Sequence, residues 1–230
     1  MYTAPQIVTS GLVLSLDAAN PKSYSGTGTI WYNRAANLNA GVSNNATLVN
    51  GPTFNSGNLG NIVFDGTNDY ADFYAPNLGT TTTVEMWCKP LSLIDDMFFG
   101  WFAYDVWANG GIIGFNTSVN DIYGMSSTTV ANLGILNNWK HYVFEMRSDV
   151  SYTNNKIYIN AENQILSQQR GSESAGSRNF NNGLGRIGSW RINANFFMPM
   201  NCASFKVYNR ALTASEVLQN YNAIRTRFGL

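Results

Sequence analysis

Polar and apolar side chains alternate along most of this chain, and this period of two limits the fold more than any other feature of the sequence. In residues 81–90, Val84 and Met86 fall on one face, whereas Glu85 and Trp87 fall on the other. Such alternation is typical of an extended strand, because successive side chains of a strand point in opposite directions. We therefore expect a strand here, with its apolar face turned toward a core.

Further strands are expected where the same alternation, or a short apolar run, is bounded by turn-forming residues. They cover residues 11–17, 97–103, 111–115, 122–125, 139–147, 156–160, 184–188 and 203–208. The run 97–103 is apolar on both faces, which indicates a strand covered on both sides. Many short strands at this spacing predict an all-β chain that folds as a two-sheet antiparallel sandwich.

One segment near the C-terminus has the period of a helix instead. Thr213, followed three residues later by Glu216, forms a capping box, in which each side chain bonds to the backbone of the other residue. Gly229 is a natural helix stop. Between them, apolar residues recur at helical spacing, namely Val217, Leu218, Tyr221 and Ile224. One short helix is therefore expected to finish the β body.

No linker, internal repeat or charge block divides the 230 residues, so we expect one domain. It spans residues 11–230 and follows an N-terminal arm, residues 1–10. Lys and Arg together number 14, as do Asp and Glu, which argues against a nucleic-acid partner, since such proteins carry a basic surface. No apolar run approaches the roughly 20 residues of a membrane span and no signal peptide is visible, so membrane insertion is not expected.

The residues available for catalysis argue against an enzyme. His141 is the only histidine, and nothing adjacent in the sequence would orient it as a general base. Glycoside hydrolysis needs two carboxylates brought together, but the five glutamates are scattered and no E-x-D-x-E strand occurs. We therefore expect a non-enzymatic protein. A catalytic function would require carboxylates that converge in space without a sequence motif.

Carbohydrate binding is the function that the loop residues best suit. Sugar sites combine a flat aromatic face with amides or carboxylates that bond to hydroxyl groups. Two loop regions offer this mixture, and their candidate binding residues are Tyr104, Asp105, Trp107, Asn109, Trp190 and Asn193. Aromatic side chains in strands more often serve simple packing, and Trp101, which lies in an apolar run, is expected in the core.

Five segments of the chain resemble laminin-G-like domains of the concanavalin A-like lectin/glucanase superfamily. They are Phe64–Tyr70 (FDGTNDY), Thr83–Pro90 (TVEMWCKP), Asn138–Val143 (NWKHYV), Lys156–Asn160 (KIYIN) and Val207–Val217 (VYNRALTASEV). Each segment is weak alone, but all five occur in the family's order and spacing over residues 11–228. The N-terminal half, including Gly11–Tyr24 and Ala46–Phe54, is similar to laminin-G-like domains in structural proteins of tailed bacteriophages.

This resemblance implies a concanavalin A-like jelly roll on the surface of a phage virion, as a capsid decoration or as a tail or fibre component. The expected partners are other virion proteins and copies of the same chain. The alternative function is that of a carbohydrate-binding lectin module, whose partners would be glycans on the host surface.

No cofactor is expected, although related domains often bind calcium through oxygen ligands. The oxygen donors on offer are Asp17, Asp65, Asp69, Asp72 and Asp121. Some of these stand among ordinary turn formers, which favours a turn over a bound ion. The resemblance also places the strands of Cys88 and Cys202 close together. Buried free thiols are favoured there, and a disulfide is the alternative.

Overall fold

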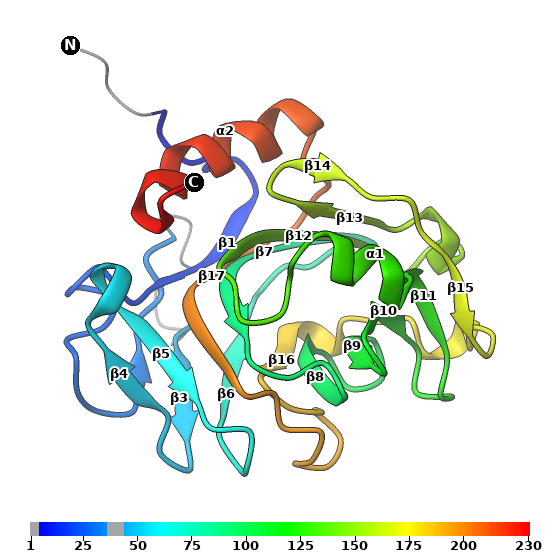
Figure 1. The fold of residues 1–230 in the computed structure, drawn as a ribbon, viewed down its shortest axis with the longest axis horizontal. Helices are drawn as coiled ribbons and strands as arrows, with labels where there is room; N and C mark the ends of the chain where they lie inside the picture. The colour runs from blue at the N-terminus through cyan, green and yellow to red at the C-terminus, as the bar shows by residue number, and fades with distance from the viewer. Residues whose placement is uncertain (1–4, 36–43) are drawn as a thin grey trace.

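Two antiparallel β-sheets packed face to face make up the body of the protein (Figure 1). The computed structural model describes residues 5–35 and 44–230, so part of the expected N-terminal arm, residues 1–4, lies outside the described residues. Sheet A has the strand order β14-β13-β12-β7-β17-β5-β4, with β1 paired to β17. Sheet B has the order β15-β11-β10-β9-β8-β16-β6-β3-β2. The predicted all-β, two-sheet antiparallel sandwich is confirmed.

Among the described residues, nine strands lie on the predicted segments, with the expected run 97–103 found as a strand only over 95–100. Eight strands were not predicted, and one of them, Asp105–Asn109, lies in a region that was expected to be a loop. Sheet A contains β1 (Leu12–Asp17), β4 (Thr53–Asn55), β5 (Asn61–Phe64), β7 (Thr81–Pro90), β12 (Lys140–Arg147), β13 (Lys156–Ile159), β14 (Glu162–Asn163) and β17 (Met200–Tyr208). Sheet B contains β2 (Ile30–Trp31), β3 (Ala46–Val49), β6 (Tyr70–Tyr74), β8 (Asp95–Gly100), β9 (Asp105–Asn109), β10 (Ile112–Asn116), β11 (Ile122–Met125), β15 (Ser167–Arg170) and β16 (Leu184–Ile187). The helical segments are α1 (Ser127–Asn132), α2 (Ala214–Ile224) and the 3₁₀ turns η1 (Gly57–Leu59), η2 (Tyr152–Asn154), η3 (Ala175–Ser177), η4 (Asn181–Gly183) and η5 (Arg225–Phe228).

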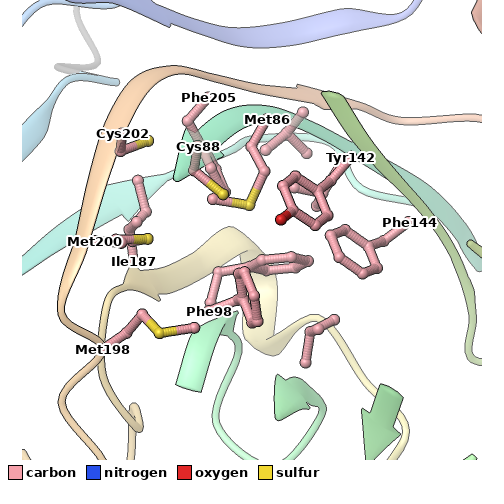
Figure 2. Packing of buried hydrophobic residues seen from close by; sticks show 14 of the residues in the cluster. Met86, Cys88, Phe98, Tyr142, Phe144, Ile187, Met198, Met200, Cys202 and Phe205 are labelled. Carbon is pink, nitrogen blue, oxygen red and sulfur yellow. The ribbon is translucent and has the colours of Figure 1, made fainter. Parts of the chain in front are cut away.

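Apolar side chains from both sheets fill the space between them (Figure 2). Met86 and Phe144 enter from sheet A and Phe98 and Ile187 from sheet B, and all four are fully buried. Burying a side chain of this size is worth about 1.5–3 kcal/mol, so the interleaved layers supply most of the stabilisation. Trp101 is also fully buried in this core, which confirms the role expected for it.

The two cysteines face each other across neighbouring strands of sheet A. Cys202 of β17 is the direct partner of Cys88 on β7, and Figure 2 shows both side chains among the buried residues of the core. Both thiols are free and fully buried, as the favoured alternative expected. Burial raises the pKa of each thiol, so both stay protonated and unreactive.

Helix α2 lies across the outer face of sheet A (Figure 1). It begins with the predicted capping box: Thr213 Oγ1 accepts a hydrogen bond from Glu216 N at 3.3 Å, and the Glu216 carboxylate accepts one from Thr213 N at 2.8 Å. Its last turn continues into η5, which ends at Gly229 in the left-handed conformation, with φ 73°. Trp87, pointing outward from β7, stacks on Phe228 with ring centroids 4.4 Å apart. The helix therefore covers the face of β7 that carries Glu85 and Trp87.

The face that α2 turns toward the sheet differs from the expected one at two positions. Leu218 was expected on the apolar face, but its side chain is 50% exposed. Asn220 is fully buried instead. Its amide oxygen accepts a hydrogen bond from Val8 N at 2.7 Å, and its amide nitrogen donates to Glu85 and to Tyr208 Oη. The helix is rotated to place an amide over polar groups of the sheet, a requirement that apolar spacing does not reveal.

Those polar groups form a buried cluster, here called the Glu85 cluster: Glu85, His141, Lys206, Tyr208 and Asn220. Lys206 Nζ lies 2.7 Å from Glu85 Oε1, and both side chains are almost completely buried. His141, for which the sequence indicated no orienting neighbour, is fully buried with Nε2 3.5 Å from the same carboxylate oxygen. The cluster lies beneath α2 and holds the helix and the N-terminal segment at Val8 against sheet A.

Helix α1 was not expected from the sequence. It follows β11 directly, and the side chain of Ser126 caps it by accepting a hydrogen bond from Thr129 N at 3.2 Å. Within residues 5–35 and 44–230, neither α1 nor any other helix is long and apolar enough to cross a membrane.

Candidate functional site

A small pocket on the outer face of sheet B brings together three separate parts of the chain. Its volume is about 190 Å³, and its lining consists of Met97, Trp107, Asn116, Ser118, Asn120, Trp190 and Phe196. We call it the Trp107–Trp190 pocket. It is smaller than the roughly 300–1,000 Å³ typical of sites for drug-sized ligands, so it suits one small ring.

Trp107 reaches this outer face because of its place in β9. Its neighbours Val106 and Ala108 belong to the core between the sheets, so the alternation of the strand turns the indole outward. Indole Nε1 donates to Asp95 Oδ1 at 2.9 Å, and the guanidinium carbon of Arg170 lies 5.2 Å from the ring centroid. These contacts hold the indole in one orientation, which a binding site needs.

The second tryptophan comes from the loop between β16 and β17, which folds back over sheet B. Within the loop, Trp190 N donates to the carbonyl of Asn195 at 2.9 Å, and Met97 N of β8 donates to the carbonyl of Phe196 at 2.9 Å. Arg186 of β16 donates to the Trp190 carbonyl at 3.1 Å while it pairs with Asp72 at 2.7 Å. The loop is thereby fixed at both ends and sets Trp190 across from Trp107.

The polar end of the pocket is built by the β10–β11 hairpin, whose two strands were predicted from the sequence. Asp121 shapes its turn: the carboxylate accepts hydrogen bonds from Asn116 Nδ2, Thr117 N, Thr117 Oγ1 and Val119 N at 2.8–3.4 Å. Ser118 adopts a left-handed conformation, with φ 65°, as a tight turn requires. The hairpin therefore presents Asn116 and Ser118 to the pocket.

Asp105 lies on the same face of β9 as Trp107 and is 1% exposed. Its direct partner on β8 is Gly100, where a Cβ atom would stand only 2.1 Å from Asp105 Cβ, so glycine is needed to make room for this side chain. Burial, and then the charge of Asp121, raise the pKa of the Asp105 carboxyl well above its usual range, although the Trp190 indole opposes the shift.

Polar atoms without partners gather at this pocket. Within the described residues, neither carboxyl oxygen of Asp105 has a hydrogen-bond partner, and the same holds for Trp190 Nε1 and Ser118 Oγ. The Trp190 indole lowers the pKa of Asp105 as a hydrogen-bond donor does, so the indole faces this carboxyl group behind the pocket.

The structure separates the six predicted binding residues into three groups. Trp107 and Trp190 line the pocket together, with Asp105 directly behind them. Tyr104 is fully buried on the core side, and its hydroxyl donates to the Arg147 carbonyl at 3.0 Å, so it cannot touch a ligand. Asn109 is bonded to Arg170 and Asp95 outside the lining, and Asn193 is exposed elsewhere on its loop.

Sequence reasoning missed the other lining residues, namely Met97, Asn116, Ser118, Asn120 and Phe196. Some of these lining residues could have been predicted from the sequence. The predicted strand over residues 111–115 follows β9 closely in the sequence and pairs with it, and neighbouring strands place their outward side chains on one face. The loop carrying Phe196 gave no such signal, because its return to sheet B depends on tertiary hydrogen bonds.

A larger hollow of about 580 Å³ lies at one end of the sandwich and is lined mainly by asparagine and glycine residues around Phe180. The Phe180 ring is 6% exposed and packs on Trp101 with centroids 5.0 Å apart, so it offers no free aromatic face. The smaller Trp107–Trp190 pocket is therefore the stronger candidate for a ring-shaped ligand.

The expected calcium donors do not gather. Within residues 5–35 and 44–230, no group of three or more His, Cys, Asp or Glu side chains is placed to hold a metal ion. The five aspartates bond to the protein instead: Asp17 to Arg227, Asp72 to Arg186, Asp65 and Asp69 within their own turn, and Asp121 within its hairpin. That the protein needs no cofactor stays a prediction.

Comparison with known proteins identifies relatives of this architecture. The family model Laminin_G_3, described as the concanavalin A-like lectin/glucanases superfamily, matches residues 65–218. No curated protein matches the chain significantly.

Among solved structures, the chain is similar to the receptor binding domain of botulinum neurotoxin C/D mosaic serotype, with a TM-score of 0.60 and 10% identity over 93% of this chain and 51% of that one. It is also similar to Trypanosoma rangeli sialidase in complex with sialic acid, with a TM-score of 0.64 and 13% identity over 98% of this chain and 36% of that one. The chain thus spans about half of the first protein and about a third of the second. At this identity the likeness concerns the fold alone.

Proposed function

Because the chain belongs to the Laminin_G_3 family of the concanavalin A-like lectin/glucanases superfamily, we propose that it is a lectin-like domain that binds carbohydrate without altering it chemically. One observation carries the proposal. Trp107 and Trp190, far apart in the sequence, line one small pocket together with the polar side chains of Asn116, Ser118 and Asn120. This combination of aromatic rings and polar groups matches the apolar face and the hydroxyl-bearing edge of a sugar ring.

The chemistry follows from the shape of a pyranose. Its C–H face is apolar and stacks on an indole, while its hydroxyl groups require donors and acceptors at the ring edge. Trp190 is half-buried and keeps part of its ring accessible, whereas Trp107 is 5% exposed and forms the wall behind it. Asn116, Ser118 and Asn120 are placed to bond the hydroxyl groups.

We propose binding rather than catalysis because of how the nearby carboxyl groups are engaged. Asp105 and Asp121 do converge behind the pocket, which is the condition for a catalytic function. However, both are buried, and Asp121 already accepts hydrogen bonds from its own hairpin. A hydrolytic pair needs both carboxyl groups at the scissile bond.

The test is glycan binding by a Trp190→Ala protein. We expect it to bind its best glycan at least tenfold more weakly than the unaltered protein, a loss of about 1.4 kcal/mol, because the stacking face is removed. The matched control is Trp139→Ala, since Trp139 is equally half-buried but packs on Phe228 at the opposite sheet. Isothermal titration or a glycan array measures the difference. Equal binding by the two variants would contradict the proposal.

A second role is also proposed: a structural component on a virion surface, held by other virion proteins or by copies of the same chain. The N-terminal resemblance to tailed-phage proteins supports it. An apolar groove of about 430 Å³, lined by Leu93, Ile94, Val130, Ile135 and Leu136 among others, favours it independently. Ile94 is 76% exposed there, and exposed apolar patches mark interaction surfaces.

Incorporation into particles tests this second role. We expect Ile94→Glu to lower the amount of protein in purified particles at least tenfold, as measured by quantitative mass spectrometry, because a charge would be buried in the interface. Ile165→Glu is the control, since Ile165 is 91% exposed and lies outside the groove. If the unaltered protein is missing from particles, or if both variants are incorporated equally, the role is wrong.

A further inference from the structure

Phe196, in the loop between β16 and β17, has a backbone conformation that aromatic residues seldom adopt. Its φ is 53°, in the left-handed region, and among the described residues it is the one aromatic residue with a positive φ. A bulky side chain crowds the backbone there, so the conformation persists only where its surroundings enforce it, and such strain is concentrated at binding sites. Here Met97 N donates to the Phe196 carbonyl at 2.9 Å, and Trp190 N donates to the Asn195 carbonyl at 2.9 Å. These bonds hold a strained loop that places the Phe196 ring in the lining of the Trp107–Trp190 pocket.

The Phe196 ring stands steeply to both tryptophans of the pocket. Its centroid lies 6.2 Å from that of Trp107 with 70° between the ring planes, and 5.7 Å from that of Trp190 with 69° between the planes. A pyranose that lies flat on either indole therefore stands steeply to Phe196 as well and cannot stack on that ring. Met97 adds a flexible apolar side chain to the same lining. The corner is therefore complementary to a compact apolar group that the sugar carries in addition to its ring.

The polar part of the lining is uncharged. Within the residues that the structure describes, no Asp, Glu, Lys, Arg or His side chain lines the pocket. Charges of both signs lie outside the lining: Asp95 accepts from the Trp107 indole at 2.9 Å, and the Arg170 guanidinium carbon lies 5.2 Å from the same ring. Arg191 comes directly after the loop tryptophan. Asn120 is exposed at the pocket, and no hydrogen bond engages its side-chain amide among the described residues. An amide both donates and accepts, so it matches another amide without favouring a charge.

We propose that the Trp107–Trp190 pocket selects sugars that carry an N-acetyl group. The inference rests on the proposed carbohydrate binding and names its class of ligand. The acetamido methyl group fills the corner beside Phe196, and the acetamido N–H and carbonyl bond to the Asn120 amide, while the sugar ring stacks on Trp190. A sugar with a hydroxyl group at the same carbon brings no methyl group to this corner. The apolar surface of Phe196 then stays in contact with water, and the sugar is held less tightly.

A glycan array with matched pairs tests the selectivity. The two members of a pair differ only in an acetamido or a hydroxyl group on the terminal sugar, as in N-acetylglucosamine against glucose and N-acetylgalactosamine against galactose. We expect the best-binding glycan to be acetylated and its partner to bind about tenfold more weakly or worse, because the methyl contact and the amide hydrogen bonds are lost. A best-binding glycan without the acetamido group, or one whose partner binds as well, would overturn the selectivity and leave carbohydrate binding standing. Failure of every glycan to bind would overturn carbohydrate binding itself, and the selectivity with it.

Two glycine substitutions test the roles of Phe196 and Asn120. Phe196→Gly removes the ring where φ is 53°, and Asn120→Gly removes the amide where φ is 64°; glycine adopts both values without strain, so both variants should fold. We expect each to reduce the preference within the best pair to about threefold or less. The matched controls are Phe102→Gly, at an exposed phenylalanine, and Asn137→Gly, at an exposed asparagine with φ 62°; both lie outside the lining and should keep the full preference.

Thermal unfolding shows which variants are folded. If Phe196→Gly does not fold, Asn120→Gly decides alone, because Asn120 is exposed and its side chain supports no other part of the fold. An undiminished preference in the folded pocket variants, or an equal loss in the controls, would overturn the inference.

Discussion

Replacing Lys206 by methionine is expected to destabilise the protein by about 3–5 kcal/mol at pH 7, because it leaves the buried Glu85 carboxylate without its counter-charge. Lys206 is 3% and Glu85 0% exposed at their side chains, and the two charged atoms lie 2.7 Å apart. Methionine keeps the apolar volume of the lysine stem, so the loss comes from the charge rather than from a cavity. Since each kcal/mol shifts the melting temperature of a domain this size by about 2–4 °C, the midpoint should fall by roughly 6–20 °C.

The size of this loss should also depend on pH. Burial alone would raise the pKa of Glu85, but the Lys206 ammonium and the His141 side chain outweigh burial and lower the pKa from 4.5 to about 2. A folded-state pKa below the unfolded value stabilises the protein above the unfolded pKa, and this contribution is lost as the pH falls from about 4.5 toward 2. The Lys206→Met variant lacks most of this pH-dependent stabilisation. Its free energy of unfolding should therefore approach that of the unaltered protein as the pH falls from about 4.5 toward 2.

Urea unfolding at several pH values between 7 and 3 measures both effects. Arg147→Met is the matched control, because Arg147 pairs with Asp149 at 3.3 Å with both side chains about one-third exposed. Exposed pairs are worth about 0–1 kcal/mol, so the control should lose little and show no convergence near pH 4. A constant difference between the Lys206→Met and unaltered proteins across this range would contradict the assigned role of the Glu85 pair.

Replacing Trp87 by alanine is expected to cost about 3–5 kcal/mol through the cavity it leaves beneath α2 and η5. The indole is fully buried and stacks on Phe228 at 4.4 Å and on Tyr221 at 5.8 Å. The loss should begin locally, because these ring contacts connect the C-terminal segment to sheet A. Hydrogen exchange at residues 214–228 should therefore accelerate more than exchange in the strands, with thermal unfolding reporting the overall loss.

Leu218→Ala provides the comparison on the same helix. Leu218 is 50% exposed on the side away from the sheet, so its truncation should change stability by no more than about 0.5 kcal/mol. If Trp87→Ala left exchange at residues 214–228 unchanged, or if Leu218→Ala had a comparable effect, α2 would not be held by the stacked rings.

The sandwich could be predicted because its determinants are local. In β7, a strict alternation places Val84 and Met86 inward and Glu85 and Trp87 outward, and each side chain is found there. The start of α2 could also be predicted from the sequence, since a capping box involves only Thr213 and nearby residues. Each of these signals depends on spacing within a few residues, which tertiary contacts did not override.

The rotation of α2 and the composition of the site could not be predicted in the same way. Asn220 is buried because Glu85 and Tyr208 lie beneath it, and no pattern within the helix encodes those partners. Trp190 lines the same pocket as Trp107 only because its loop returns to sheet B through backbone hydrogen bonds. The position of Tyr104, by contrast, could have been predicted. Extending the alternation of β9 by one residue places the Tyr104 side chain inward, on the face opposite Trp107.

The two ends of the described chain lie on the side of the molecule opposite the Trp107–Trp190 pocket. The Gln6 carbonyl accepts a hydrogen bond from Gln219 Nε2, and Leu230 N donates to the Arg225 carbonyl, so both ends rest at α2, outside sheet A. A scaffold attached through either end would leave the pocket facing outward. Under the proposed carbohydrate binding, many tethered copies would engage one glycan-bearing surface at once, and even a weak single contact would yield firm attachment through avidity.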